Sequence, residues 1–134
     1  MSGGGRVVLD TTAYSRFRAG NESVIDWLAG AAVVYLPVTV VGELHAGFAL
    51  GTRRRQNEES LAGLLREPFV EVLDVDSEVA RQYGEIFAQL RRAGTPIPTN
   101  DIWIAATTLR AGGHLLTFDR DFEQVRGLPH TLFA

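Results

Sequence analysis

Short apolar segments alternate with segments of helical periodicity along most of this chain. Four of the apolar segments are predicted to be strands, at residues 7–9, 33–36, 69–75 and 114–118, and residues 131–133 can add a short edge strand. Strands that are apolar on both faces are typical of a parallel sheet covered by helices. The sequence therefore predicts a three-layer α/β/α fold with a mostly parallel central sheet of four to five strands.

The segments between the predicted strands repeat their apolar residues at helical spacing. Helices are predicted at residues 13–17, 23–28, 39–50, 57–66, 77–92 and 100–111. Asp76 can cap the fifth of them, and Thr99 or Asn100 can cap the sixth. At 134 residues, without an internal repeat or a linker, the chain is expected to form one domain after a flexible lead-in at residues 1–5.

The composition excludes several kinds of chemistry. All thirteen basic residues are arginine, and the chain has neither lysine nor cysteine. A Walker-type phosphate loop, Schiff-base catalysis, a disulfide framework and a thiolate metal site are therefore excluded. The three histidines lack a zinc-site spacing, and no G-x-S-x-G nucleophile elbow is present. A net charge of −3 argues against binding DNA by charge alone.

No segment has the apolar length of a signal peptide or a membrane span. Together with the absence of cysteine, this favours a reducing compartment. A cytoplasmic protein without membrane contact is therefore expected.

Two aspartates follow predicted strands at their carboxyl ends, which is where open α/β sheets bind ligands. Asp10 comes directly after residues 7–9, and Asp119 directly after residues 114–118. Each also has an ordinary interpretation, Asp10 as a helix cap and Asp119 as a loop residue. Because neighbouring parallel strands bring their carboxyl ends together, the two side chains are expected to share one site.

Two further acids lie on predicted helices. Glu43 borders an apolar helical stripe, and Asp101 lies in the first turn of its helix, where the helix dipole favours an acid. A solvated face and a helix start are sufficient explanations for these two residues. If all four acids converge, two carboxylates about 4 Å apart repel each other by roughly 4 kcal/mol at an effective dielectric constant near 20. Without lysine, Mg²⁺ or Mn²⁺ is the expected compensation, because these ions prefer carboxylate oxygens.

The order of these elements resembles the PIN domain and, more narrowly, the toxin component of VapBC-type toxin–antitoxin modules. The matching segments are spread over almost the whole chain, from residue 7 to residue 125, and read VVLDTTAY, TVVGELHAG, PTNDIWIAATTLRAG and LLTFDRDFEQV. The resemblance implies an Mg²⁺- or Mn²⁺-dependent endoribonuclease. It also implies catalysis and metal ligation by Asp10, Glu43, Asp101 and Asp119, with Asp121 as an auxiliary ligand.

Other polar residues match positions that commonly line such sites. Thr12 and Thr117 match hydroxyl positions, although helix capping and ordinary strand composition explain them as well. Asn100 can hydrogen-bond within the site or cap its helix. The run Arg53, Arg54 and Arg55 can contact RNA phosphates or an antitoxin, or it can be a solvated helix start.

The resemblance also implies three partners: an RNA substrate, a cognate antitoxin protein and a second copy of the chain in a homodimer. Aromatic residues of the early helices are candidates for an interface, unless the core buries them: Tyr14, Phe17, Trp27 and Phe48. Alternative functions are a PIN-type nuclease of RNA processing and a non-catalytic RNA- or protein-binding module. A haloacid-dehalogenase-type phosphatase and a response-regulator receiver each need a lysine that the chain lacks.

Overall fold

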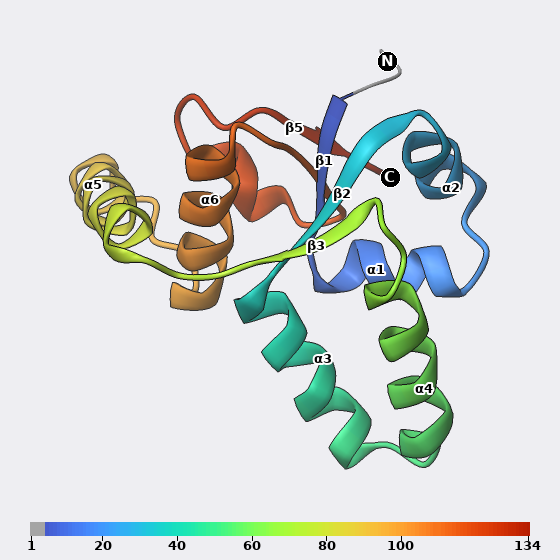
Figure 1. Ribbon diagram of the computed structural model, residues 1–134. Coiled ribbons are helices and arrows are strands. Elements are labelled where there is room, and N and C mark those ends of the chain that lie inside the picture. Colours follow the sequence, from blue (N-terminus) through green and yellow to red (C-terminus); the bar gives the residue numbers. More distant parts are fainter. Residues whose placement is uncertain (1–4) are drawn as a thin grey trace.

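The computed structural model describes residues 5–134, in which five parallel strands form one sheet with helices on both faces (Figure 1). The strands are β1 (Gly5–Leu9), β2 (Ala31–Pro37), β3 (Val70–Leu73), β4 (His114–Thr117) and β5 (His130–Leu132). They pair in the order β3-β2-β1-β4-β5, and each pairing is parallel. The predicted three-layer α/β/α fold is confirmed, and β5 is the predicted edge strand.

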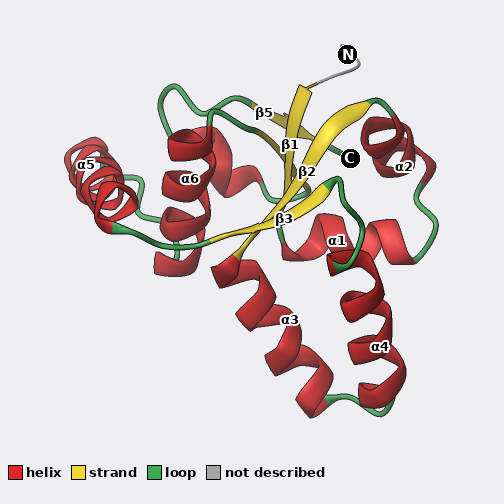
Figure 2. Cartoon of the chain, viewed as in Figure 1, coloured by secondary structure: helices red, strands yellow, loops and turns green. Residues whose placement is uncertain are grey.

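Pairs of helices make the long connections between strands. They are α1 (Thr11–Arg18), α2 (Glu22–Ala29), α3 (Val38–Leu50), α4 (Arg54–Leu65), α5 (Ser77–Ala93) and α6 (Thr99–Ala111), and a short 3₁₀ helix η1 (Arg120–Gln124) precedes β5. In Figure 2, α5 and α6 lie on one side of the sheet and α1 and α2 on the other. The hairpin of α3 and α4 extends beyond the sheet. Within residues 5–134, no helix has the length and apolar character required to cross a membrane.

The strand order reverses at β1. From β1 the chain moves outward to β2 and β3, and then returns through α5 and α6 to β4 on the other side of β1. At such a switch point the flanking connections diverge, which opens a crevice at the carboxyl ends of the two central strands. Leu9 of β1 is paired with Leu116 of β4, and the Asp10 N–H donates to the Leu116 carbonyl at 3.4 Å. The residues that follow β1 and β4 are thereby held side by side.

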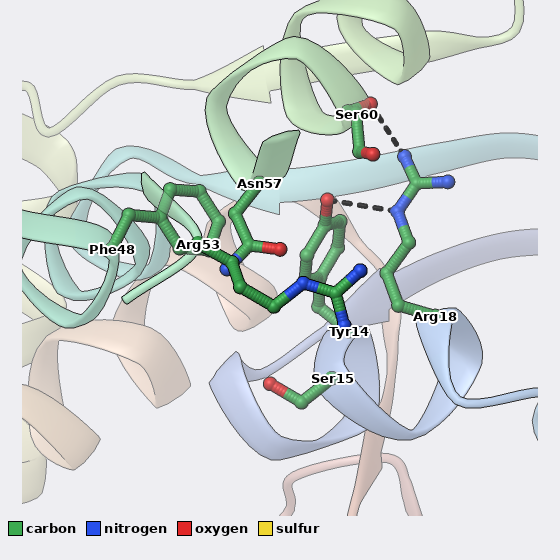
Figure 3. A pocket seen from close by; sticks show the side chains of 7 residues that line it. All are labelled: Tyr14, Ser15, Arg18, Phe48, Arg53, Asn57 and Ser60. Atoms are coloured by element: carbon green, nitrogen blue, oxygen red, sulfur yellow. Dashed lines mark hydrogen bonds between the residues drawn. The ribbon is translucent and has the colours of Figure 1, made fainter. Parts of the chain in front are cut away.

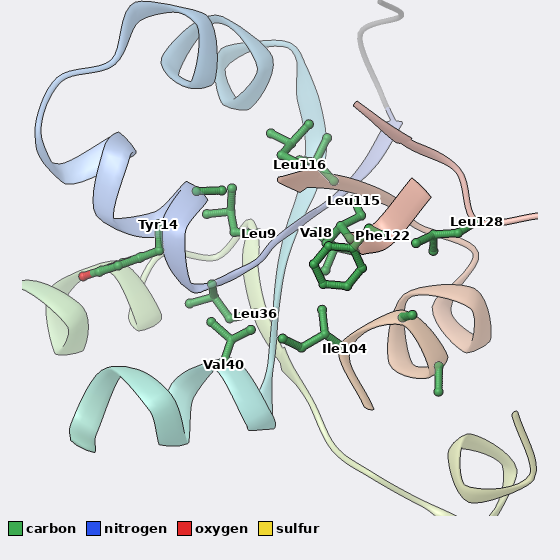
Figure 4. Packing of buried hydrophobic residues seen from close by; sticks show 14 of the residues in the cluster. Val8, Leu9, Tyr14, Leu36, Val40, Ile104, Leu115, Leu116, Phe122 and Leu128 are labelled. Atoms are coloured by element: carbon green, nitrogen blue, oxygen red, sulfur yellow. The ribbon is translucent and has the colours of Figure 1, made fainter. Parts of the chain in front are cut away.

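Apolar packing on both faces keeps this junction rigid. Val8 and Leu115 point to the same face of the sheet, where Ile104 of α6 and Phe122 of η1 cover them (Figure 4). All four side chains are almost completely buried. Leu9 and Leu116 point to the other face, as the alternation along a strand requires. The continuous apolar runs are thus strands covered on both sides, as predicted.

The aromatic residues considered as interface candidates all pack against the core. Tyr14 is buried, and Phe17, Trp27 and Phe48 are half-buried against the core. Burial therefore accounts for Tyr14, whereas Phe17 and Phe48 pack against the core and also line surface pockets.

Some predicted boundaries were wrong. Gly5, assigned to the flexible lead-in, already belongs to β1, while residues 1–4 of that lead-in lie outside the described residues. Helix α4 begins at Arg54 rather than at residue 57, with Arg53 at the N-cap position and no side-chain cap, so the usual start signal is missing. Strand β3 ends at Leu73, because its partner β2 ends at the paired residue, Pro37.

Candidate metal-binding site

Asp10 is buried at the junction of β1 and α1, with only 5% of its surface exposed. Its Oδ1 accepts a hydrogen bond from the Ala13 N–H at 2.8 Å and so caps α1. Its Oδ2 accepts a hydrogen bond from the Thr117 hydroxyl at 2.5 Å. Asp10 is therefore a helix cap and also a member of the strand-end cluster, so its two interpretations are compatible.

Thr117, the last residue of β4, links two of the acids. Its fully buried hydroxyl donates to Asp10 and accepts a hydrogen bond from the Asp119 N–H at 2.9 Å. Asp119 caps η1, and its Oδ1 accepts a hydrogen bond from the Asp121 N–H at 2.8 Å. This turn keeps Asp121 beside Asp119. The segment T-x-D-x-D is thus shaped by its own side-chain hydrogen bonds.

Glu43 reaches the site from α3. Its Oε1 accepts a hydrogen bond from the Thr11 hydroxyl at 2.5 Å, and its Oε2 accepts one from the Asn100 side-chain amide at 3.2 Å. Because Thr11 lies on α1 and Asn100 on α6, this carboxylate joins three helices.

The predicted cap of α6 was wrong. Pro98 occupies the N-cap position and makes no side-chain cap. Thr99 and Asn100 are the first two helical residues, and the Asn100 amide donates to Glu43. A charged acceptor makes a stronger hydrogen bond than a neutral one, which accounts for the orientation of this amide.

Asp101, in the first turn of α6, completes the cluster. One carboxylate oxygen each from Asp101, Asp119 and Asp121 lies within 4.8 Å of the other two. Ligand oxygens lie about 2.0–2.6 Å from Mg²⁺ or Ca²⁺, so two oxygens of one coordination shell are at most roughly twice that distance apart. The spacing and the purely oxygen donor set therefore fit a hard divalent cation, and they give Asp121 a place equal to the other two aspartates.

The pKa of Asp101 reflects this environment. Burial raises it to about 7, and the negative charges of Asp119, Glu43, Asp121 and Asp10 add to the effect in that order. Burial also raises the pKa of Asp10, while hydrogen bonds from Thr117 and Ala13 lower it and the charges of Asp119 and Glu43 raise it. Without a cation, the cluster therefore retains a proton near neutral pH.

This raised pKa predicts that the metal-free protein loses stability as pH rises. The Asp101 carboxyl ionises at 3.8 in the unfolded chain and at about 7 in the folded one. Over this range the folded state binds the extra proton, so the free energy of unfolding decreases with pH and levels off above pH 7. Urea unfolding in excess chelator should show this slope for wild type and a smaller slope for Asp101→Asn. If the difference in free energy of unfolding between the two proteins did not change with pH, the pKa of Asp101 would not be raised in the folded state.

Thr117 provides a separate test of the hydrogen-bond network. Thr117→Val keeps the shape of the side chain but removes the partner of the Asp10 carboxylate and of the Asp119 N–H. A buried polar group without its partner costs about 1–3 kcal/mol, so the free energy of unfolding should decrease by about that amount. Thr117→Ser, which retains the hydroxyl, is the matched control. Equal stability of the valine and serine variants would show that the hydroxyl does not hold these acids.

Among the described residues, the other positions proposed from the sequence, Thr12 and the three arginines at 53–55, form no hydrogen bond with the carboxylate cluster. Thr12 is exposed, and the hydroxyl that reaches Glu43 belongs to its neighbour Thr11, which sequence reasoning missed. The only available signal for Thr11 was its position next to Asp10. The three arginines at residues 53–55 are exposed at the start of α4, where Arg55 pairs with Glu59 and Arg53 lines a pocket.

Comparison with known families identifies the family of the chain. Residues 7–128 match the family model of the PIN domain, a range that includes all five acids of the site. The chain belongs to the PIN domain family. The resemblance inferred from the four sequence segments is thereby confirmed.

Known proteins are similar over nearly the full chain. The plasmid stability protein StbB of Pseudomonas syringae pv. tomato is 35% identical over 130 residues, covering 91% of this chain and 94% of its own. Ribonuclease VapC4 of Mycobacterium tuberculosis is 30% identical over 122 residues, which cover 87% of this chain and 88% of VapC4. A chain of the DNA-bound VapBC structure from Salmonella typhimurium has a TM-score of 0.84 at 25% identity, and the match covers 97% of this chain and 99% of that one. Within the PIN family, the chain therefore resembles VapBC-type proteins.

Proposed function

We propose that this PIN domain is a metal-dependent endoribonuclease and the toxin of a type II toxin–antitoxin system. Its hydrolysis of RNA phosphodiesters would inhibit translation and growth. The observation that carries the proposal is the convergence of Asp101, Asp119 and Asp121, with carboxylate oxygens within 4.8 Å of one another. The names of the relatives support it, since one is a ribonuclease and one structure is a VapBC complex.

Five carboxylates would hold one or two Mg²⁺ or Mn²⁺ ions: Asp10, Glu43, Asp101, Asp119 and Asp121. When bound, such an ion polarises a phosphoryl oxygen and promotes ionisation of the attacking water. The proton retained by the Asp101 carboxyl near neutral pH leaves when the cluster takes up a cation.

Hydrogen bonds orient two of these carboxylates in advance. Thr117 and the Ala13 N–H hold Asp10, and Thr11 and Asn100 hold Glu43. Groups fixed before the substrate arrives need little reorganisation during the reaction. We assign Thr11, Asn100 and Thr117 as positioning residues of the site.

A protein partner is part of the same proposal. A pocket of about 230 Å³ on the face formed by α1, α2, α4 and the start of β3 is lined by apolar side chains, among them Phe17, Ile25, Leu28 and Phe69. Ile25 and Phe69 are 39% and 44% exposed. Because exposed apolar patches commonly mark protein interfaces, we assign this surface to the cognate antitoxin. The homodimer that the family implies remains part of the proposal.

Induction in a bacterial host without an antitoxin tests the function. The wild-type protein should arrest growth and produce new RNA 5′-phosphate ends at defined sites, whereas Asp101→Asn should do neither. Co-expression of the cognate antitoxin should restore growth. Equal toxicity of wild type and Asp101→Asn would favour the non-catalytic binding module. Specific cleavage without growth arrest would favour a nuclease of RNA processing.

A further inference from the structure

A polar pocket of about 380 Å³ lies between α1, α3 and α4 (Figure 3). Tyr14 and Arg18 enter it from α1, Phe48 from α3, and Arg53 and Ser60 from the start and middle of α4. Figure 3 shows the Arg53 side chain extending toward Tyr14 from one side and Arg18 bonded to the Tyr14 hydroxyl from the other. Two cationic side chains from different helices therefore converge on one cavity.

Neither arginine is neutralised there. Arg18 donates from Nε to the Tyr14 hydroxyl at 2.9 Å and from Nη2 to the Ser60 carbonyl at 2.6 Å. Arg53 donates from Nε to the Gln56 side-chain carbonyl at 2.7 Å. These acceptors carry no charge, and the ion pairs found within residues 5–134 include neither arginine. Since each guanidinium has five N–H donors, several remain free for an anion.

An aromatic ring accompanies these charges. Phe48 is half-buried on the pocket wall, and the Tyr14 ring is fixed below the Arg18 guanidinium at 5.3 Å. A cationic surface beside an aromatic ring is typical of sites for single-stranded nucleic acid, where the ring stacks on a base and the arginine binds a phosphate. The chemistry of the pocket thus suits a nucleotide.

The pocket adjoins the carboxylate cluster. Ser15 on its wall lies one helical turn beyond Thr11, whose hydroxyl bonds to Glu43. On α3, Phe48 follows Glu43 by a little more than one turn. One turn of α-helix rises about 5.4 Å, so the pocket begins roughly 5–8 Å along the two helices from the Thr11–Glu43 contact. One RNA strand can occupy both places.

We propose that this pocket binds the nucleotide next to the scissile phosphodiester, with Arg53 and Arg18 on its phosphate and Phe48 against its base. The proposal rests on the function proposed above and names a substrate-binding surface for it. The chain has a net charge of −3, and its carboxylate cluster repels phosphate. The two arginines of the neighbouring pocket give the RNA strand a local attraction that offsets this repulsion.

Arg53 gives a clean test, because it is exposed and its neighbour Arg54 supplies a matched control outside the pocket. Arg53→Gln and Arg54→Gln would each be made in the Asp101→Asn background, where RNA remains intact. Their affinity for a fluorescein-labelled single-stranded RNA of about ten nucleotides, within the range that such sites cover, would be measured by fluorescence anisotropy at several salt concentrations.

Arg53→Gln is expected to weaken RNA binding about tenfold, as for loss of one charged hydrogen bond. The slope of log affinity against log salt should decrease by about 0.7, as for one phosphate contact of a single strand. Arg54→Gln should change the affinity less than about twofold. Equal losses in the two variants would overturn the proposal, because they would indicate general charge attraction. Unchanged RNA binding by Arg53→Gln, with or without weaker antitoxin binding, would also overturn it.

Cleavage assays separate this proposal from the one on which it depends. If wild type cleaves no RNA in the presence of Mg²⁺, the proposed function fails. If wild type and Arg53→Gln, both with Asp101 intact, cleave equally well at low RNA concentration, only the pocket assignment fails.

Discussion

Asp101→Asn is expected to reduce Mg²⁺-dependent RNA cleavage by at least about 100-fold, which exceeds the usual effect of losing a residue that only supports a metal ligand. Asp101 lies with Asp119 and Asp121 in the closest group of carboxylates, and asparagine removes one negative charge from it. The same change should raise the thermal midpoint of the metal-free protein, because it relieves the burial and repulsion that raise the pKa of Asp101. Activity and stability should therefore change in opposite directions.

Because activity should fall while thermal stability rises, a loss of function can be distinguished from unfolding. Initial cleavage rates on a labelled RNA and melting in excess chelator would be measured on the same preparation. Asp26→Asn, the same chemical change at an exposed position of α2, is the matched control and should leave both quantities unchanged. If Asp101→Asn lost activity together with thermal stability, the residue would be a structural one.

Removal of divalent ions is expected to lower cleavage by wild type at least to the level of Asp101→Asn. Five acids converge at one site, and the ion pairs found within residues 5–134 include none of them, so the metal-free cluster repels phosphate. Dialysis against a chelator followed by return of Mg²⁺ or Mn²⁺ should restore the rate. Cleavage that continued unchanged in excess chelator would show that these acids act without a metal.

The layers of the fold were predictable from sequence because apolar runs and helical periodicity are local properties. Residues 7–9 and 114–118 could be recognised as buried strands without knowing their neighbours. The strand order β3-β2-β1-β4-β5 could not be obtained in this way. It depends on the direction in which α5 and α6 cross the sheet, which no local pattern encodes. That crossing is what makes β1 and β4 neighbours.

The residues of the candidate site likewise fall into those that local sequence predicts and those that depend on tertiary packing. Asp10 and Asp119 were predicted from physics alone, because each follows a buried strand at the edge where ligands bind. Glu43 and Asp101 had sufficient structural explanations of their own and were selected by the order of the matching segments. Thr11 was missed because its contact joins helices 32 residues apart in sequence. The orientation of Asn100 toward Glu43 spans 57 residues and likewise depends on tertiary packing.

The arginine run shows a similar limit. From the sequence, Arg53, Arg54 and Arg55 were interpreted as one basic patch. In the structure, Arg53 and Arg55 have different surroundings. Arg53 lines the pocket between α1, α3 and α4, and Arg55 pairs with Glu59 on its own helix. Residues adjacent on a helix do not face the same surface. A charge run therefore has to be resolved residue by residue before a function is assigned to it.

The acids at the switch point between β1 and β4 are proposed to form a divalent-metal site. Titration of Mn²⁺ into the metal-free protein, with free Mn²⁺ followed by electron paramagnetic resonance, tests it without depending on an RNA substrate. Wild type should bind Mn²⁺ saturably, and Asp101→Asn should bind it at least about tenfold more weakly. Absence of binding by wild type, or equal binding by the two proteins, would show that these acids do not form the metal site.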